Sequence, residues 1–72
     1  MTSTTSIAIT ANGKPFTPAA GTRLPDFLNE LGFEPGLVVV ERNRQALTPA
    51  ETRKTVLEDG DRLEIVQITA GG

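Results

Sequence analysis

The C-terminal residues Ala70, Gly71 and Gly72 are the part of this sequence whose types and spacing could carry chemistry. Glycine has no β-carbon, so this segment can lie fully extended, turn in either direction and pass through a slot too narrow for a side chain. At the end of a strand, such a segment presents its terminal carboxylate. We therefore expect Gly72 to be the reacting residue. Ala70 and Gly71 should form an extended segment that enters a channel of another protein together with Gly72.

The other residue types offer little for catalysis. The sequence contains no cysteine, histidine, tyrosine or tryptophan, which excludes disulfides, thiolate metal sites and a cysteine nucleophile, and leaves no general base near neutral pH. Glu58, Asp59 and Asp61 are close in sequence, but Asp-Gly-Asp is turn chemistry and its spacing does not reproduce a calcium loop. We predict no metal site and a chain that is not itself an enzyme.

Length and charge limit the remaining possibilities. A chain of 72 residues allows one domain with a modest core. Its seven basic and nine acidic residues are interspersed, which argues against nucleic acid or an anionic membrane as partner. No apolar run approaches a membrane span, and residues 1–6 lack the features of a targeting signal. We expect a cytoplasmic protein with a disordered tail over residues 1–6, one domain over residues 7–69 and a flexible tail over residues 70–72.

The C-terminal tail follows a predicted strand over residues 62–69. Leu63 and Ile65 alternate with Glu64, which is typical of a strand with one buried face. Val66 and Ile68 have the opposite parity, so they should face solvent on the other side of the sheet. Single exposed aliphatic residues are common, but two of them just before the tail favour a partner-docking patch.

The N-terminal part of the chain has the pattern of a β-hairpin. Residues 7–11 alternate as a first strand, and Asn12-Gly13 is a strong signal for a type I′ turn, which needs positive φ at both positions. Residues 14–17 return as a second strand. Pro15 and Pro18 lack an amide donor, so this strand should lie at an edge of the sheet.

One amphipathic helix is predicted over residues 24–31. Its apolar residues fall at the i, i+3, i+4 and i+7 positions of a single stripe, namely Leu24, Phe27, Leu28 and Leu31. Thr22 is the expected N-cap, and Gly32 should end the helix in a left-handed conformation with Phe33 folding back on the last turn. A helix of two turns is not stable alone in water, so the stripe must pack on the sheet.

The middle of the chain supplies the remaining elements. Residues 37–40 are a β-branched run suited to an interior strand, and Asn43-Arg44 predicts a tight turn before a short strand over residues 45–47. Residues 48–51 fit a capping box with proline at the first helical position. Residues 55–57 should bury apolar side chains, and four basic residues should form a solvated face: Arg42, Arg44, Arg53 and Lys54.

This order of elements matches the ubiquitin-like β-grasp, an α+β fold with a mixed sheet and one main helix packed across one face. More specifically, the chain resembles the sulfur-carrier proteins of thiamine biosynthesis, the ThiS-like members of that fold family. The resemblance covers nearly the whole chain after residue 6. It rests on Asn12-Gly13, the helix over residues 24–31, Val40-Glu41 with Asn43, the run over residues 59–67 and the final Ala70-Gly71-Gly72.

The resemblance implies a chemistry for the tail. An E1-like, ThiF-type adenylyltransferase would condense the Gly72 carboxylate with ATP, so that AMP becomes the leaving group. A sulfur donor such as a cysteine desulfurase would supply the sulfur that displaces AMP, and the resulting thiocarboxylate would deliver it to thiazole synthase, a ThiG-type partner. This chain would bind no cofactor, since ATP and Mg²⁺ belong to the activating enzyme.

Two departures and two alternatives accompany this resemblance. Arg42 stands where the thiazole carriers usually have an aliphatic residue, and Thr48-Pro49 replaces a more common Pro-Arg pair. The small subunit of molybdopterin synthase has a similar fold and the same terminal pair, so a molybdopterin carrier is one alternative. The other is a ubiquitin-like modifier whose Gly72 forms an isopeptide bond to a lysine. A further possibility is an interaction domain with an inert tail, which would be neither a sulfur carrier of either kind nor a modifier.

Overall fold

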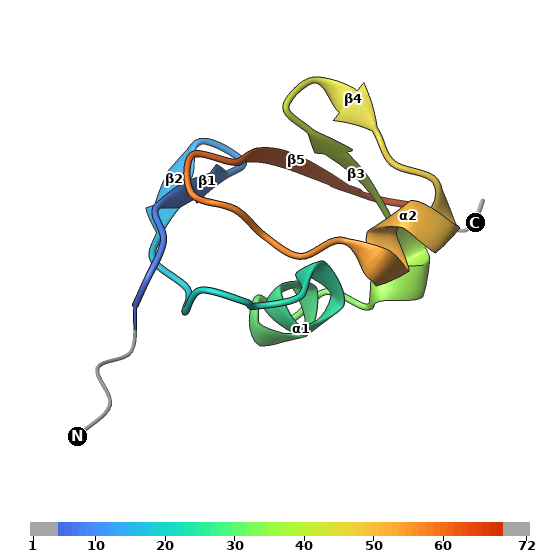
Figure 1. The fold of residues 1–72 in the computed structure, drawn as a ribbon. Coiled ribbons are helices and arrows are strands. Elements are labelled where there is room, and N and C mark those ends of the chain that lie inside the picture. The colour runs from blue at the N-terminus through green and yellow to red at the C-terminus, as the bar shows by residue number, and fades with distance from the viewer. Residues whose placement is uncertain (1–4, 69–72) are drawn as a thin grey trace.

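The computed structural model describes residues 5–68 of the chain, and these form a five-stranded sheet in the order β2-β1-β5-β3-β4 (Figure 1). Two short α-helices and a 3₁₀ turn connect the strands. The strands are β1 (Ile9–Ala11), β2 (Lys14–Phe16), β3 (Val38–Arg42), β4 (Gln45–Ala46) and β5 (Arg62–Gln67). The helical elements are α1 (Leu24–Glu30), η1 (Pro35–Leu37) and α2 (Pro49–Lys54).

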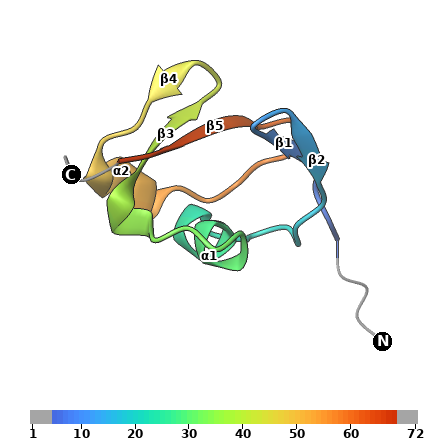
Figure 2. The same cartoon turned by 180° about the vertical axis from the view of Figure 1, so that it is seen from behind.

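The central strand β5 makes the sheet mixed. It pairs in parallel with β1 and antiparallel with β3, while β1–β2 and β3–β4 are antiparallel hairpins. Figures 1 and 2 place the β1–β2 hairpin and helix α2 at opposite ends of the domain, with β5 running between them. The predicted mixed sheet is confirmed, and so is the edge position of β2, the strand that contains Pro15.

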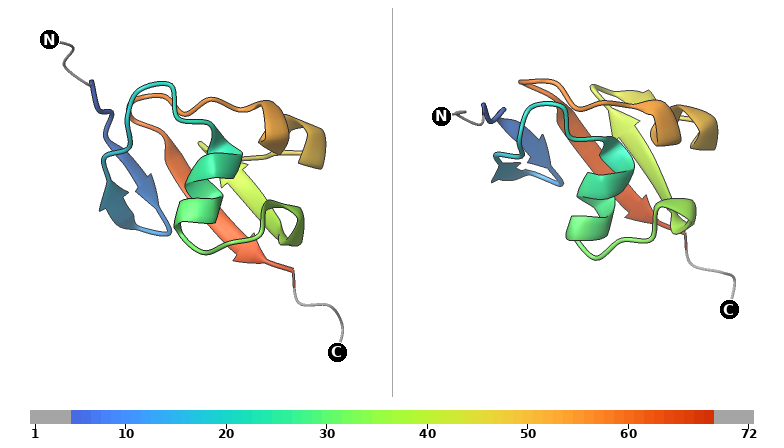
Figure 3. Two further views of the ribbon diagram at one scale, coloured as in Figure 1. Left: turned by 90° about the horizontal axis from the view of Figure 1, so that it is seen from below. Right: turned by 60° about the horizontal axis from the view of Figure 1, so that its bottom comes forward.

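Helix α1 crosses one face of this sheet, as both views in Figure 3 show. The predicted N-cap is wrong: the capping residue is Arg23, without a side-chain cap, because the Thr22 hydroxyl donates instead to the Ala19 carbonyl at 2.6 Å. The predicted C-terminal stop is confirmed. Gly32 has φ of +88°, and the Phe33 amide donates to the Leu28 carbonyl at 2.9 Å, which closes the last turn.

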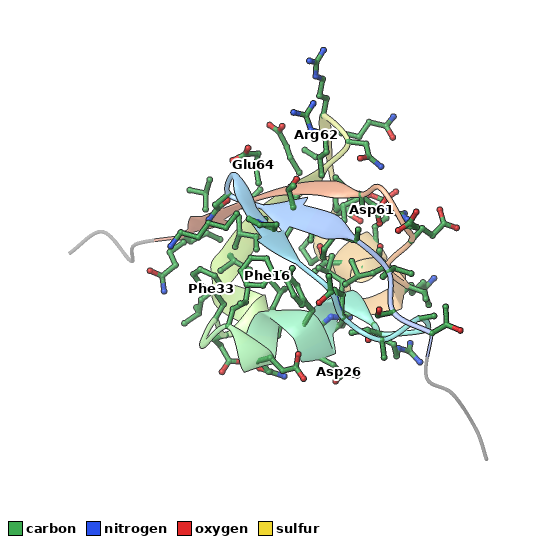
Figure 4. The ribbon with its side chains drawn as sticks, turned by 90° about the vertical axis from the view of Figure 1, so that its left-hand side faces the viewer. Phe16, Asp26, Phe33, Asp61, Arg62 and Glu64 are labelled. Carbon is green, nitrogen blue, oxygen red and sulfur yellow. The ribbon has the colours of Figure 1, made fainter. Side chains whose placement is uncertain are left out.

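The core lies between α1 and the sheet. Leu24, Phe27 and Leu28 are buried as predicted, whereas Leu31 is half-buried because the helix ends at Glu30. The ring of Phe16, on the edge strand, meets the ring of Phe27 edge-on with centroids 5.4 Å apart. Figure 4 shows Phe16 and Phe33 on the helix side of the sheet. The other buried apolar residues are Ile7, Ile9, Ala11, Val38, Val40, Leu57, Leu63 and Ile65.

Two segments beside the core differ from expectation. In the stretch over residues 55–57, Leu57 is buried but Val56 is 45% exposed, so only one of its two aliphatic side chains contributes to the core. At the N-terminal end, the Thr5 carbonyl accepts the Ala20 amide at 2.7 Å and Ser6 forms a β-bridge with Ala19. Backbone pairing therefore already involves residues 5 and 6, next to the predicted domain boundary. None of the described helices is long and apolar enough to cross a membrane.

Candidate functional site

The turn that precedes β5 is held by its own carboxylates. Gly60 has φ of +88°, as the turn requires. Asp61 Oδ2 accepts the Glu58 amide at 2.9 Å, and Asp59 Oδ1 accepts the Ala8 amide at 2.7 Å. The positive φ of Gly60 and the bond from the Glu58 amide to Asp61 confirm that Asp-Gly-Asp forms a turn. Together the two hydrogen bonds tie the start of β5 to β1 and so fix where the strand begins.

Asp61 also anchors the β3–β4 turn. Its carboxylate is 4% exposed and accepts from Arg42 Nε at 3.0 Å and from Asn43 Nδ2 at 3.1 Å. Arg42 was predicted to lie on a solvated face, and this prediction is wrong. Its guanidinium also reaches Glu58 at 3.3 Å and the Val56 carbonyl at 3.4 Å. Arg42, which stands where related carriers usually have an aliphatic residue, therefore has a structural role as the ion-pair partner of Asp61.

The other border of β5 is fixed by Asn12. Its side chain accepts the Ile65 amide at 2.7 Å and donates to the Ile65 carbonyl at 3.2 Å. The side-chain amide thus makes the two hydrogen bonds that the backbone of a neighbouring strand would make, and it extends the pairing of β5 beyond the end of β1. The sequence indicated Asn12 only as a turn residue, because its partner lies 53 positions away. Its φ of +51° confirms the predicted turn conformation.

Strand β3 carries this register towards the tail. Val39 lies opposite Val66, and beyond the end of the strand the Ile68 amide donates to the Leu37 carbonyl at 2.8 Å. The backbone is thus held in place up to Ile68, four positions before Gly72. The three predicted tail residues, Ala70, Gly71 and Gly72, lie outside the described residues.

The open face of the sheet, away from α1, carries the predicted docking residues. Val66 and Ile68 are 63% and 52% exposed, which confirms that they face away from the core. Two neighbours on β3's side, Leu37 and Val39, are 56% and 44% exposed. We call these four residues the aliphatic patch. Leu37 and Val39 were missed because a continuous run of aliphatic residues hides which members alternate outward until its pairing with β5 is known.

A shallow pocket borders the aliphatic patch. It measures about 190 Å³ and lies where η1, β3 and α2 meet, with Ile68 and Val39 in its wall. Helix α2 is positioned there by its capping box, in which Thr48 Oγ1 accepts the Glu51 amide at 3.1 Å and Glu51 accepts the Thr48 amide at 2.8 Å. This capping box confirms the prediction for residues 48–51. The surface around Ile68 is thus apolar and slightly concave.

Metal binding finds no support within residues 5–68. No group of three or more acidic side chains there is placed to hold an ion. What the structure describes here is an exposed aliphatic patch and a backbone that is held by hydrogen bonds up to Ile68.

Comparison with known proteins gives a consistent family. The sequence profile of the ThiS family matches residues 5–72. A thiazole synthase of Magnetococcus marinus is 39% identical over 61 residues, and the chain spans 85% of its own length but only 19% of that protein's. The sulfur carrier protein ThiS of Thermus thermophilus is 38% identical over 61 residues, covering 85% of this chain and 94% of that carrier.

A solved structure agrees with these sequence relatives. The crystal structure of a thiamine biosynthesis protein (ThiS) from Geobacter metallireducens has a TM-score of 0.75 at 30% identity, and covers 92% of this chain and 100% of that one. The mixed sheet with α1 across one face, together with this likeness, defines a ubiquitin-like β-grasp domain. Within that class, the chain belongs to the ThiS family.

Proposed function

We propose that this chain is a sulfur carrier for thiamine thiazole biosynthesis, acting in the cytoplasm, and that the carboxylate of Gly72 is its reacting group. One observation carries the proposal most directly. The backbone of a ThiS-family domain is held in register up to Ile68, beside an exposed aliphatic patch, immediately before the tail. A domain built in this way fixes the position of Ile68, and hence the point from which the tail departs, relative to a docking face.

The proposed chemistry is adenylation of Gly72 followed by transfer of sulfur to it. The Gly72 carboxylate attacks the α-phosphorus of ATP, so an acyl-adenylate forms and pyrophosphate leaves. A persulfide of the sulfur donor then attacks the activated carbonyl and AMP leaves, so that an acyl disulfide joins Gly72 to the donor. A second thiol attacks the donor's sulfur in that disulfide, which forms a disulfide between this thiol and the donor and releases the Gly72 thiocarboxylate. The partners supply the catalytic groups and the Mg²⁺ of the nucleotide, because this sequence has no cysteine or histidine for covalent or acid–base work. The chain acts as a protein substrate and not as an enzyme.

The contribution of the domain is positional. Ordering the tail in a channel costs about 1–2 kcal/mol of backbone entropy per residue. Contacts made by the aliphatic patch around Val66 and Ile68 offset this cost, since an interface that covers these exposed side chains removes apolar surface from water. The bonds that Asp61 and Asn12 make to the borders of β5 keep the strand from shifting, and so keep the reacting carbon within reach of the nucleotide.

We propose three partners for this cycle: an adenylyltransferase of the E1-like, ThiF type, a sulfur donor such as a cysteine desulfurase, and a thiazole synthase of the ThiG type. The relatives named thiazole synthase favour the last of these, because 19% of such a protein resembles this chain. A carrier-like segment within the chain of a synthase gives the two parts a high effective concentration for each other.

Deleting Gly72 tests the proposal. The deletion withdraws the carboxylate by one residue from the nucleotide, and attack geometry tolerates only small displacements, so ATP–pyrophosphate exchange with the adenylyltransferase should be abolished. Ala70→Gly keeps the length of the tail and serves as the matched control, which should retain exchange. Exchange at the wild-type rate after deletion of Gly72 would overturn the proposal, provided that both variants melt like the wild-type protein.

A further inference from the structure

The open face of the sheet carries charges in a fixed order behind the aliphatic patch. Glu64 on β5 lies directly opposite Glu41 on β3, and both side chains are exposed. One step further from the tail come Arg62, on β5, and Arg44, in the β3–β4 turn, and these four charged residues line one shallow depression. Figure 4 shows Arg62 and Glu64 projecting from the sheet on the side opposite Phe16 and Phe33. Along β5 the order is therefore aliphatic, acidic, basic.

Glu41 and Glu64 form a like-charged pair across β3 and β5, and Arg44 and Arg62 line the same depression without reaching ion-pair distance of either carboxylate. Like charges directly opposite each other in an antiparallel pair destabilise a sheet. The ion pairs found within residues 5–68 both belong to Arg42, on the other side of the sheet, so neither Glu41 nor Glu64 is neutralised by a described neighbour at ion-pair distance. A basic side chain of a partner protein, placed between the two carboxylates, would meet both at once and relieve their repulsion.

We propose that these bands form one oriented docking surface for the adenylyltransferase, and that the enzyme presents an aliphatic cluster, then a basic side chain, then an acidic side chain in matching order. This inference rests on the proposed function and adds to it the chemistry of the partner's surface. The aliphatic contacts supply affinity, and the charge bands supply orientation. Rotating the partner by half a turn on this face would keep the central contact between acidic and basic groups, but it would place the partner's acidic side chain against the aliphatic patch and its aliphatic cluster against Arg44 and Arg62. Both mismatches bury a charge against apolar groups, so the orientation that directs the tail into the active site is favoured.

A second copy of this chain fits the surface less well. Two copies facing each other about a two-fold axis could place Glu41 and Glu64 of one copy against Arg44 and Arg62 of the other. That arrangement would leave both aliphatic patches beyond the contact, still facing water. A different protein that matches all three bands would cover the aliphatic patch as well as the charged residues. The order of the bands therefore favours a different protein over a second copy of this chain.

The test measures steady-state adenylation as a function of carrier concentration for Glu64→Gln and Glu41→Gln. Each substitution should raise KM for the carrier about two- to fivefold, as expected for loss of a partly exposed charge contact, and leave kcat unchanged. The same variants should melt at a higher temperature than the wild-type domain, because the repulsion within the pair is removed. Glu30→Gln is the matched control: it removes one exposed carboxylate from α1, on the opposite face, and should change neither KM nor kcat.

Each outcome bears on a distinct claim. Unchanged KM values for both Glu64→Gln and Glu41→Gln, with normal exchange by the wild-type carrier, would overturn the banded docking surface and leave the carrier function standing. Absence of exchange with the wild-type carrier would overturn the proposed function, and the docking proposal with it. A concentration-dependent increase in molecular mass that these substitutions abolish would assign the surface to a second copy of the chain instead.

Discussion

Replacing Asp61 by alanine should destabilise the domain more than any other single change to its polar residues. The carboxylate is buried and accepts three hydrogen bonds, from the Glu58 amide, Arg42 Nε and Asn43 Nδ2. Removing it leaves the Glu58 amide and the Asn43 side chain without this acceptor, and leaves the Arg42 guanidinium with only its longer contacts. Because Asp61 joins the last turn to the β3–β4 turn, its loss loosens both the start of β5 and its border with β3.

The size of this effect follows from burial. Removing one partner of a fully buried ion pair costs about 3–5 kcal/mol. The Arg42 side chain is 24% exposed and keeps contacts with Glu58 and Val56, so water and these partners recover part of the loss. We expect Asp61→Ala to lower the free energy of unfolding by about 2–4 kcal/mol. A domain of 72 residues has only about 4–11 kcal/mol in total, so this is a large share.

Urea denaturation followed by far-ultraviolet circular dichroism measures the effect, since the sequence has no tryptophan or tyrosine for fluorescence. Asp59→Ala is the matched control. Its exposed carboxylate accepts one amide, from Ala8, and its removal should cost only about 0.5–1.5 kcal/mol. Combining Asp61→Ala with Arg42→Met should recover part of the loss, because the guanidinium then no longer lacks its main partner. Equal destabilisation by Asp61→Ala and Asp59→Ala would refute this reasoning.

Three further predictions concern the core, the patch and the tail. Phe27→Ala should lower the free energy of unfolding by about 3–5 kcal/mol, because the ring is buried against Phe16; a melting curve barely displaced would mean that α1 does not pack as described. Val66→Asp and Ile68→Asp should leave the melting temperature unchanged and weaken association with the adenylyltransferase by about 1–3 kcal/mol, measured by calorimetry, because each places a charge in the aliphatic patch; unchanged affinity for both would make the patch incidental. Gly71→Val should slow adenylation strongly without affecting thermal melts, because a branched side chain enters where a channel closes around backbone; normal exchange by this variant would contradict a narrow channel.

Local chemistry made much of the fold predictable from the sequence. The capping box at Thr48 and Glu51, the left-handed Gly32 and the turn at Asn43-Arg44 each depend on residues a few positions apart. Such signals act within one turn of the chain, and the structure confirms all of them. The N-cap of α1 was the local exception, because the Thr22 hydroxyl donates to the Ala19 carbonyl and Arg23 occupies the capping position.

The features that complete the candidate site depend on long-range pairing instead. Arg42 and Asp61 are 19 positions apart, and Asn12 and Ile65 are 53 apart, so no local pattern connects them. Leu37 and Val39 join the aliphatic patch only because β3 pairs with β5 in one particular register. The alternation along β5 predicted from the sequence that Val66 and Ile68 face away from the core. It could not predict that Leu37 and Val39 lie beside them and enlarge the exposed surface.

The mass of the intact protein isolated from its own cells shows most directly whether Gly72 carries sulfur. We expect a population heavier than the unmodified chain by the difference between one sulfur and one oxygen atom, with the change located in the C-terminal fragment. This population should disappear after deletion of Gly72. Finding instead covalent conjugates to other proteins, or only the unmodified mass under conditions in which the cell makes thiamine, would contradict the account.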